Sequence, residues 1–213
     1  MRKLRHIGLF VLVLISVQVF AQNQDFGTWV AFKVSKRWDK KFTAFGEVQS
    51  RFDQNATSLQ NSFIQGGVSL RFTKWYELGG VYRYSNNGEF DANRFDIDNK
   101  FKYKINKHNS LSMRLKYTKS FVTHKLKGDR FRIRFKYAYK VNKKVIPYAK
   151  IQYFYTKTHD FSNWQLQRYS IGSELRVAKK NFIDVFFTYQ FEFNMANPLT
   201  EYIFGVKYKL KYK

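Results

Sequence analysis

The sequence predicts an all-β protein, an antiparallel up-and-down transmembrane β-barrel of about 10–12 strands. Apolar and charged residues alternate with a period of two, which is typical of a strand with two different faces. The alternating segments run to about 11–13 residues, whereas strands of soluble sheets usually have 5–6. A tilted strand of that length crosses the apolar band of an outer membrane. The connections also alternate between short and long, as they do in such barrels.

The clearest alternation lies in residues 93–105. Phe95 and Ile97 share one face of this segment, and Arg94 and Asp96 share the opposite face. Eleven segments follow the same rule, and we expect strands at residues 26–36, 41–53, 61–72, 75–85, 93–105, 110–120, 129–140, 145–156, 164–177, 182–193 and 201–212. Bacterial single-chain barrels have an even number of strands. The odd count therefore predicts that one segment is missed, merged or outside the barrel.

The composition agrees with a folded chain and excludes several kinds of site. Of the 213 residues, 20% are aromatic and none is cysteine. The aromatic content argues against disorder despite a formal net charge of +24. The absence of cysteine excludes a disulfide scaffold, a zinc–thiolate or iron–sulfur site and a thiol nucleophile.

The first 21 residues have the features of a secretory signal peptide. Arg2, Lys3 and Arg5 form a basic start, residues 7–17 are almost wholly apolar, and a small residue, Ala21, ends the segment. An uncleaved membrane helix is the alternative, and the short apolar run disfavours it. We therefore expect two parts, a signal peptide at 1–21 and a single outer-membrane β-barrel at 22–213.

The two faces of the strands have different expected surroundings. In a membrane barrel the apolar faces contact lipid and the charged faces line the lumen. Trp38 and Trp75 stand at short connections, where an indole reaches the membrane interface. Because Lys and Arg total 39 and Asp and Glu total 15, we expect a basic lumen.

Charge pairing predicts strand registers, because opposite charges across a strand pair stabilise it and like charges destabilise it. Between the fourth and fifth predicted strands, this rule places Arg83 opposite Asp96 or Asp98. It disfavours the register that sets Arg83 against Arg94. For the ninth and tenth predicted strands, the expected pairs are Arg168 with Glu192 and Arg176 with Asp184.

Two short motifs resemble a known family. Phe26-Gly27-Thr28-Trp29 is similar to the opening strand, and Gly79-Gly80-Val81-Tyr82-Arg83-Tyr84 to the fourth strand, of predicted Gram-negative outer-membrane β-barrel proteins known only as a domain of unknown function. The resemblance implies a barrel in the outer membrane. It implies no activity and no functional residues.

The candidate anion-binding residues are Arg114, Lys116, Arg132 and Arg134. The fifth to seventh predicted strands point many Lys and Arg side chains to one side, where only Asp96 and Asp98 oppose them locally. Acidic residues from across the lumen, water or a bound anion have to compensate this repulsion. Arg suits carboxylate and phosphate because its planar guanidinium donates two parallel hydrogen bonds. The alternative is a closed, salt-bridged lumen into which acidic residues reach: Glu47, Glu77, Glu174, Asp184 and Glu192.

Histidines offer the one route to catalysis. His124 lies in a long loop, and His159 and Asp160 are adjacent in another, so these three are the catalytic candidates for an outer-membrane hydrolase. Adjacent residues on an extended chain point opposite ways, which disfavours a His159–Asp160 dyad. No metal-ligand spacing, phosphate loop or nucleophile motif accompanies them. The sequence therefore predicts no cofactor and no metal.

The leading prediction is a non-enzymatic protein of the cell outer membrane, acting as a small pore, an anionic-ligand binder or a structural barrel with a basic lumen. The expected partners are outer-membrane lipid, lipopolysaccharide, the barrel-assembly machinery and a small anionic solute. Nucleic acid is not expected, because aromatic and cationic residues occupy opposite strand faces and cannot grip one strand together. The alternatives are the hydrolase and a secreted soluble β-protein that binds polyanions.

Loop length predicts the orientation of the barrel. We expect the short connections at Trp38, 106–109 and 141–144 to face the periplasm. We expect the long connections to face the outside of the cell, at residues 54–60, 86–92, 121–128 and 157–163. Single cysteines in these connections should react with a membrane-impermeant maleimide on whole cells only in the second group. Labelling at 141–144 on intact cells would reverse the orientation.

Overall fold

The structure is a computed structural model that describes residues 23–39, 41–86, 91–122, 125–158 and 162–212. The predicted signal peptide lies outside these described residues, as do His124, His159 and Asp160. No helix in the described part of the chain is long and apolar enough to cross a membrane.

Eleven strands form a single sheet. They are β1 (Asn23–Trp38), β2 (Phe42–Asp53), β3 (Ser58–Arg71), β4 (Tyr76–Asn86), β5 (Asp91–Lys104), β6 (Asn109–Val122), β7 (Lys125–Tyr139), β8 (Val145–Lys157), β9 (Ser162–Arg176), β10 (Asn181–Glu192) and β11 (Leu199–Tyr212). Each predicted segment falls on one of these strands. The all-β prediction is confirmed.

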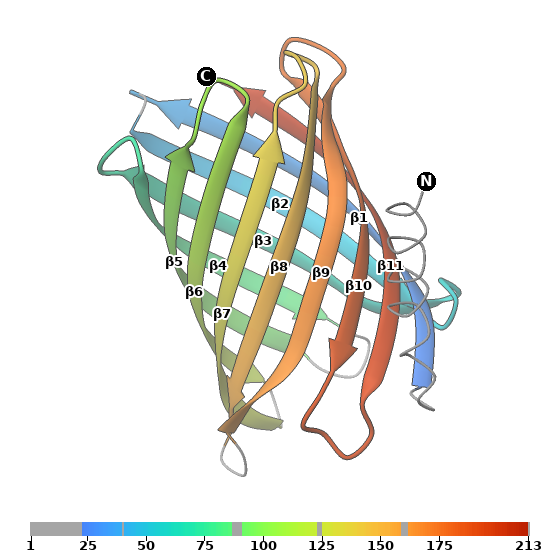
Figure 1. Ribbon diagram of the computed structural model, residues 1–213. Helices are drawn as coiled ribbons and strands as arrows, with labels where there is room; N and C mark the ends of the chain where they lie inside the picture. The colour runs from blue at the N-terminus through green and yellow to red at the C-terminus, as the bar shows by residue number, and fades with distance from the viewer. Residues whose placement is uncertain (1–22, 40, 87–90, 123–124, 159–161, 213) are drawn as a thin grey trace, which may run out of the picture.

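The sheet closes into a barrel, seen from the side in Figure 1. Consecutive strands pair in antiparallel fashion, and β1 pairs with β11 in parallel, from Asn23↔Leu199 to Lys36↔Tyr212. The expectation of an even strand number is therefore wrong for this chain. Because eleven alternating strands leave the first and last pointing the same way, the seam between them has to be parallel. A parallel ladder still pairs the backbone groups of both strands.

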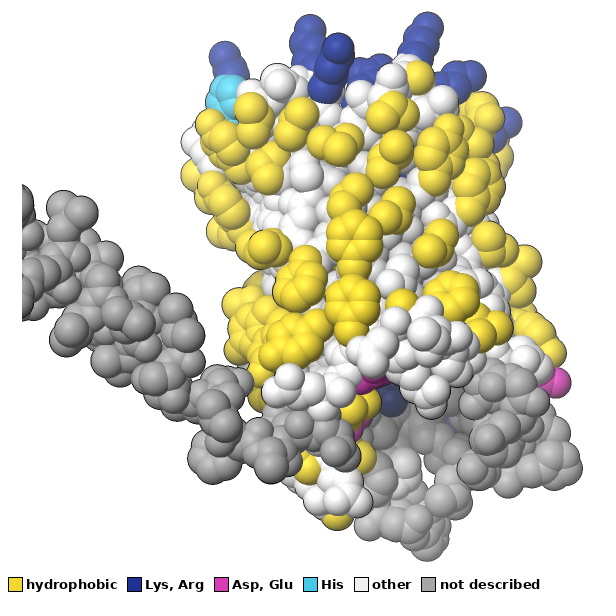
Figure 2. Space-filling model, turned by 90° about the vertical axis from the view of Figure 1, so that its right-hand side faces the viewer, with side chains coloured by type: hydrophobic (Ala, Val, Ile, Leu, Met, Phe, Trp, Pro, Cys, Tyr) yellow, Lys and Arg dark blue, Asp and Glu magenta, His cyan; other side chains and the backbone are white. Residues whose placement is uncertain are grey.

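Side chains alternate between the outer wall and the lumen, as predicted. On β5, Phe95 and Ile97 are each 54% exposed on the outer wall, whereas Asp96 between them is 5% exposed. Trp38 and Trp75 are exposed at the short turns. Figure 2 shows hydrophobic side chains over the outer wall, with Lys and Arg side chains gathered along the upper rim. Such an apolar wall suits contact with lipid.

The register between β4 and β5 contradicts the prediction. Arg83 lies opposite Arg94 rather than opposite Asp96 or Asp98. Arg83 turns instead toward β3, where its Nε and Nη2 donate to Gln65 Oε1 at 3.0 and 2.7 Å. The guanidinium thus has a hydrogen-bond partner without an aspartate across the strand pair, so the like-charge pair is tolerated.

The register between β9 and β10 also contradicts the prediction, because neither Arg168–Glu192 nor Arg176–Asp184 is a cross-strand pair. Arg168 lies opposite Gln190, and Asp184 lies opposite Glu174. Lys209 of β11 bonds to both carboxylates, at 2.6 Å to Asp184 and 3.0 Å to Glu174. The prediction considers two strands at a time and counts the Asp184–Glu174 repulsion against this register. Lys209, which comes from a third strand, compensates that repulsion.

Two glycines make room for aromatic rings inside the barrel. The ring of Phe186 lies over Gly205 on the neighbouring strand, and a Cβ at Gly205 would lie 2.1 Å from Phe186 Cζ. Phe45 covers Gly67 in the same way, with 2.7 Å from such a Cβ to Phe45 Cε1. An aromatic ring placed over a cross-strand glycine restores packing that the glycine alone lacks.

Gly205→Ala should destabilise the barrel. The new Cβ displaces the ring of Phe186 from its edge-on contact with Trp29, whose ring centroid lies 6.3 Å away. Overpacking of this kind costs about 1–3 kcal/mol. The measurement is the urea midpoint of unfolding in detergent micelles, with Gly80→Ala as control, because nothing lies within 4 Å of a Cβ at Gly80. Equal midpoints for the two variants would contradict this packing role.

Candidate functional site

Described residues line two cavities in the lumen. The larger one, about 780 Å³, extends to the short turn at residues 106–109. The smaller one, about 250 Å³, lies toward the long-loop end, beside Ser120 and Thr158. Five side chains line both cavities and so form the wall between them: Arg51, Arg83, Lys116, Arg132 and Arg168.

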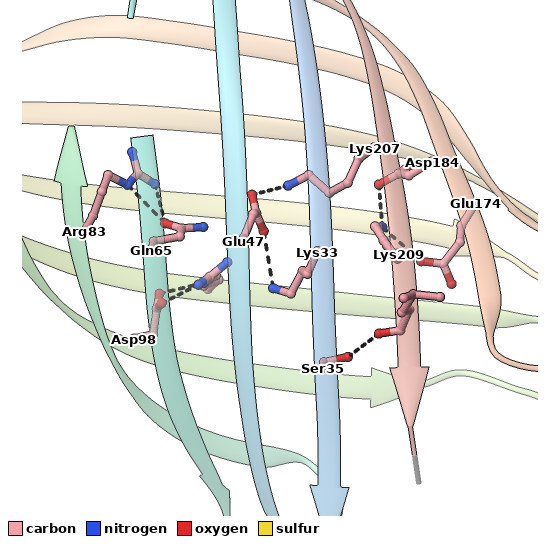
Figure 3. A network of polar contacts seen from close by, with 12 residues as sticks. Lys33, Ser35, Glu47, Gln65, Arg83, Asp98, Glu174, Asp184, Lys207 and Lys209 are labelled. Atoms are coloured by element: carbon pink, nitrogen blue, oxygen red, sulfur yellow. Dashed lines mark hydrogen bonds and ion pairs between the residues drawn. The ribbon is translucent and has the colours of Figure 1, made fainter. Parts of the chain in front are cut away.

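The described lining of the larger cavity is strongly basic, with eighteen Lys and Arg residues and three acidic ones. The acidic residues are all engaged. Glu47 accepts a hydrogen bond from Lys207 at 2.6 Å and lies 3.5 Å from Lys33 (Figure 3). Glu174 and Asp184 share Lys209 (Figure 3). The remaining cations of this cavity therefore depend on other partners.

The structure brings the four predicted anion-binding residues together. Arg114 lies opposite Arg134, and Lys116 lies opposite Arg132, across β6 and β7. Their surroundings divide them into two pairs. Arg114 donates through Nε to Asp98 at 2.6 Å, and Lys116 forms a salt bridge with Asp96.

Arg132 and Arg134 have no acidic partner within 4.0 Å among the described residues. Within the predicted set, the charge available to a solute therefore lies on β7 rather than on β6. Like charges held this close in a confined space favour a bound anion.

Sequence reasoning missed a row of arginine and aromatic side chains that follows the inner wall of the barrel from β4 through β1 to β7, between the two cavities. We name it the arginine–aromatic arc, made of Arg83, Phe63, Arg51, Trp29, Arg168, Phe154 and Arg132. Six cation–π contacts join these residues in that order, with distances from guanidinium to ring centroid between 3.9 and 5.6 Å. Trp29 links the two sides of the lumen, because its ring lies 4.3 Å from Arg51 of β2 and 4.8 Å from Arg168 of β9.

The arc contains buried donors without acceptors. The Nε atoms of Arg51 and Arg132 are buried and have no hydrogen-bond partner among the described residues, and the same holds for Nε of Arg94 in the smaller cavity. Ring faces stabilise a guanidinium without satisfying its N–H groups. A carboxylate or phosphate would accept these hydrogen bonds and neutralise the charge. The arc therefore has the chemistry of an anion site.

Among the residues that the structure describes, the only histidine is His108, and it lies in a turn. His108 lies in the β5–β6 turn, where its Nδ1 forms a hydrogen bond with Lys140 O at 2.8 Å. Among the described residues, no three His, Asp or Glu side chains are grouped closely enough to hold a metal ion. The catalytic candidates His124, His159 and Asp160 lie beyond the described part of the chain.

Comparison with protein families covers most of the chain. The family described as "Protein of unknown function (DUF2490)" matches residues 26–201. The chain belongs to this family. The resemblance drawn from the two sequence motifs is confirmed. A search among curated proteins finds no match.

Solved structures with a similar fold are outer-membrane proteins. A NanC porin matches with a TM-score of 0.54 and 10% identity, over 78% of this chain and 86% of that chain. A KdgM porin matches with a TM-score of 0.48 and 12% identity, over 73% and 80%. OmpT of Vibrio cholerae matches with a TM-score of 0.45 and 13% identity, over 71% and 54%. The family match, the closed sheet with its apolar outer wall and the fold shared with the NanC porin together make this member of the DUF2490 family an outer-membrane β-barrel.

Breaking the ion pair on the wall between the cavities should destabilise this DUF2490 barrel. In Asp96→Asn, Lys116, whose side chain is only 8% exposed, loses the nearer of its two carboxylates and keeps Asp98 at 3.4 Å, and Thr118 loses a charged acceptor at 2.5 Å. Removing one partner of a buried pair costs about 3–5 kcal/mol, and the remaining contact with Asp98 places the expected loss at the lower end of that range. The urea midpoint should fall clearly.

Asp129→Asn is the matched control for this prediction. It removes the carboxylate of the exposed Lys119–Asp129 pair, in which both side chains are at least 31% exposed, and exposed pairs contribute little. Equal losses in the two variants would contradict a buried role for Asp96.

Proposed function

We propose that this outer-membrane barrel is a pore for small anions, with the arginine–aromatic arc as the constriction at which they bind. The observation that carries the proposal is the set of buried, unpaired Nε atoms on Arg51 and Arg132, at the wall between two basic cavities. An anion entering either cavity meets donors that lack an acceptor. A cation meets uncompensated like charge.

The ion pairs of the lumen support a pore over a closed, salt-bridged plug. The plug requires acidic residues to reach the free cations. Glu47, Glu174 and Asp184 bond instead to lysines of β1 and β11, and Asp96 and Asp98 bond to β6. Within the arc, Arg83 and Arg168 donate to the uncharged Gln65 and Gln190. The Nε atoms of Arg51 and Arg132 have only ring faces beside them among the described residues and are available to a solute.

The test is electrical. Purified barrel in planar bilayers under a potassium chloride gradient should show a reversal potential that favours chloride. In Arg51→Gln with Arg132→Gln, two positive charges leave the arc, so the reversal potential should move toward zero. Lys179→Gln with Lys180→Gln removes the same charge from an exposed turn outside both cavities and should leave it nearly unchanged.

Two outcomes would contradict the pore. One is equal selectivity in the arc variant and the turn variant, which would place the selectivity outside the arc. The other is absence of conductance together with absence of thermal stabilisation by phosphate or carboxylates, which would leave only a structural role. Stabilisation by these anions without conductance would support a binding site and exclude transport.

A further inference from the structure

A cluster of exposed lysines lies on the short-turn rim above β4 to β8. We name it the basic rim, made of Lys74, Lys104, Lys107, Lys140, Lys143 and Lys144. Hydrogen bonds hold its turns beside one another: the N–H of Lys140 donates to His108 O at 2.8 Å, and the N–H of Lys102 donates to Trp75 O at 2.7 Å. None of the six lysines takes part in a salt bridge between described residues.

An apolar groove of about 490 Å³ lies on the outer wall next to the basic rim. We name it the outer groove, and its lining includes Trp75, Tyr103, Leu111, Met113, Tyr137 and Ala149. Tyr103, Leu111 and Tyr137 each lie within two residues of the strand end at the short turns. At the rise of a strand, this distance is about 7 Å or less. The groove therefore reaches the lysines.

The basic rim and the outer groove together have the chemistry of a lipid site. We propose that they bind one anionic glycerophospholipid, with its phosphate on the lysines and an acyl chain in the groove. A lysine ammonium serves phosphate as a mobile point charge. Basic clusters at the edge of the apolar layer attract anionic headgroups. The chain in the groove fixes the lipid in place beside those charges.

The charge of the rim and the expected orientation of the barrel both favour an anionic glycerophospholipid. Uncompensated lysines favour an anionic headgroup over a zwitterionic one of equal acyl length. The short turns are expected at the periplasmic leaflet, which consists of glycerophospholipid, whereas lipopolysaccharide occupies the opposite leaflet. The outer groove faces away from the lumen, and Lys74, Lys143 and Lys144 line neither lumen cavity, whereas the other three rim lysines also line the larger one. A test that changes only Lys74, Lys143 and Lys144 is therefore independent of the pore.

The test is native mass spectrometry of the barrel released from nonionic detergent. Phosphatidylglycerol, phosphatidylethanolamine with the same acyl chains, and lipid A are added in separate titrations. The wild-type barrel should retain phosphatidylglycerol in clear preference to the other two. In Lys74→Gln with Lys143→Gln and Lys144→Gln, binding of phosphatidylglycerol should weaken by about tenfold or more.

Two further variants separate the headgroup from the chain. Lys36→Gln with Lys179→Gln and Lys180→Gln removes the same charge from exposed positions on the opposite part of the rim and should keep the preference. Ala149→Trp fills the groove without changing charge and should also lower retention, since Ala149 is exposed on the outer wall. A heat-dependent shift in gel mobility checks that each variant is folded.

Three results would overturn the proposal. Equal retention of the two phospholipids would exclude headgroup recognition. Equal losses of phosphatidylglycerol binding in the two triple-lysine variants would mean that binding depends only on the net charge of the rim. Preferred retention of lipid A would assign the rim to lipopolysaccharide and reverse the expected orientation. None of these results affects the reversal potential, so the lipid site and the pore are tested separately.

Discussion

Hydrogen bonding of every strand to two neighbours is what lets this chain lie in lipid, because an unpaired backbone group there costs several kcal/mol. Closure of the sheet satisfies that demand and at the same time forces every second side chain inward. The charged residues of eleven strands thereby share one narrow space. The salt bridges of Glu47 and Lys209, the arginine–aromatic arc and the two cavities all follow from this confinement.

The lumen resolves its excess of positive charge in two ways. Toward the short turns, carboxylates are shared between cations of several strands, as Glu47 is between Lys33 and Lys207. Along the arginine–aromatic arc, ring faces take the place of carboxylates, as Trp29 does between Arg51 and Arg168. Carboxylates neutralise the positive charge. Ring faces stabilise a buried guanidinium and leave its charge in place. In the proposed pore, this difference separates a structural part of the lumen from the part at which a solute binds.

The strand positions and their faces could be predicted because a period of two is a local property of the sequence. The registers could not, because a strand has a neighbour on each side and its charges can pair with either. Asp96 of β5 pairs with Lys116 on β6 and not with Arg83 on β4. The arc was detectable in part. Trp29, Phe63 and Phe154 are aromatic residues on the otherwise polar faces of their strands. Their mutual approach across the lumen depends on barrel diameter, which no local pattern contains.

The parallel seam between β1 and β11 bears on how the barrel forms. Every other strand pair joins neighbours in the chain and can grow from its own turn, so those contacts have low sequence separation. The seam joins the two ends of the described chain and has no turn from which to start. Contacts of such large separation are slow to form, because loop-closure entropy opposes them until they are complete. The curved, open sheet is therefore the expected last intermediate, and its assembly time should depend on the β1 and β11 edges more than on any hairpin.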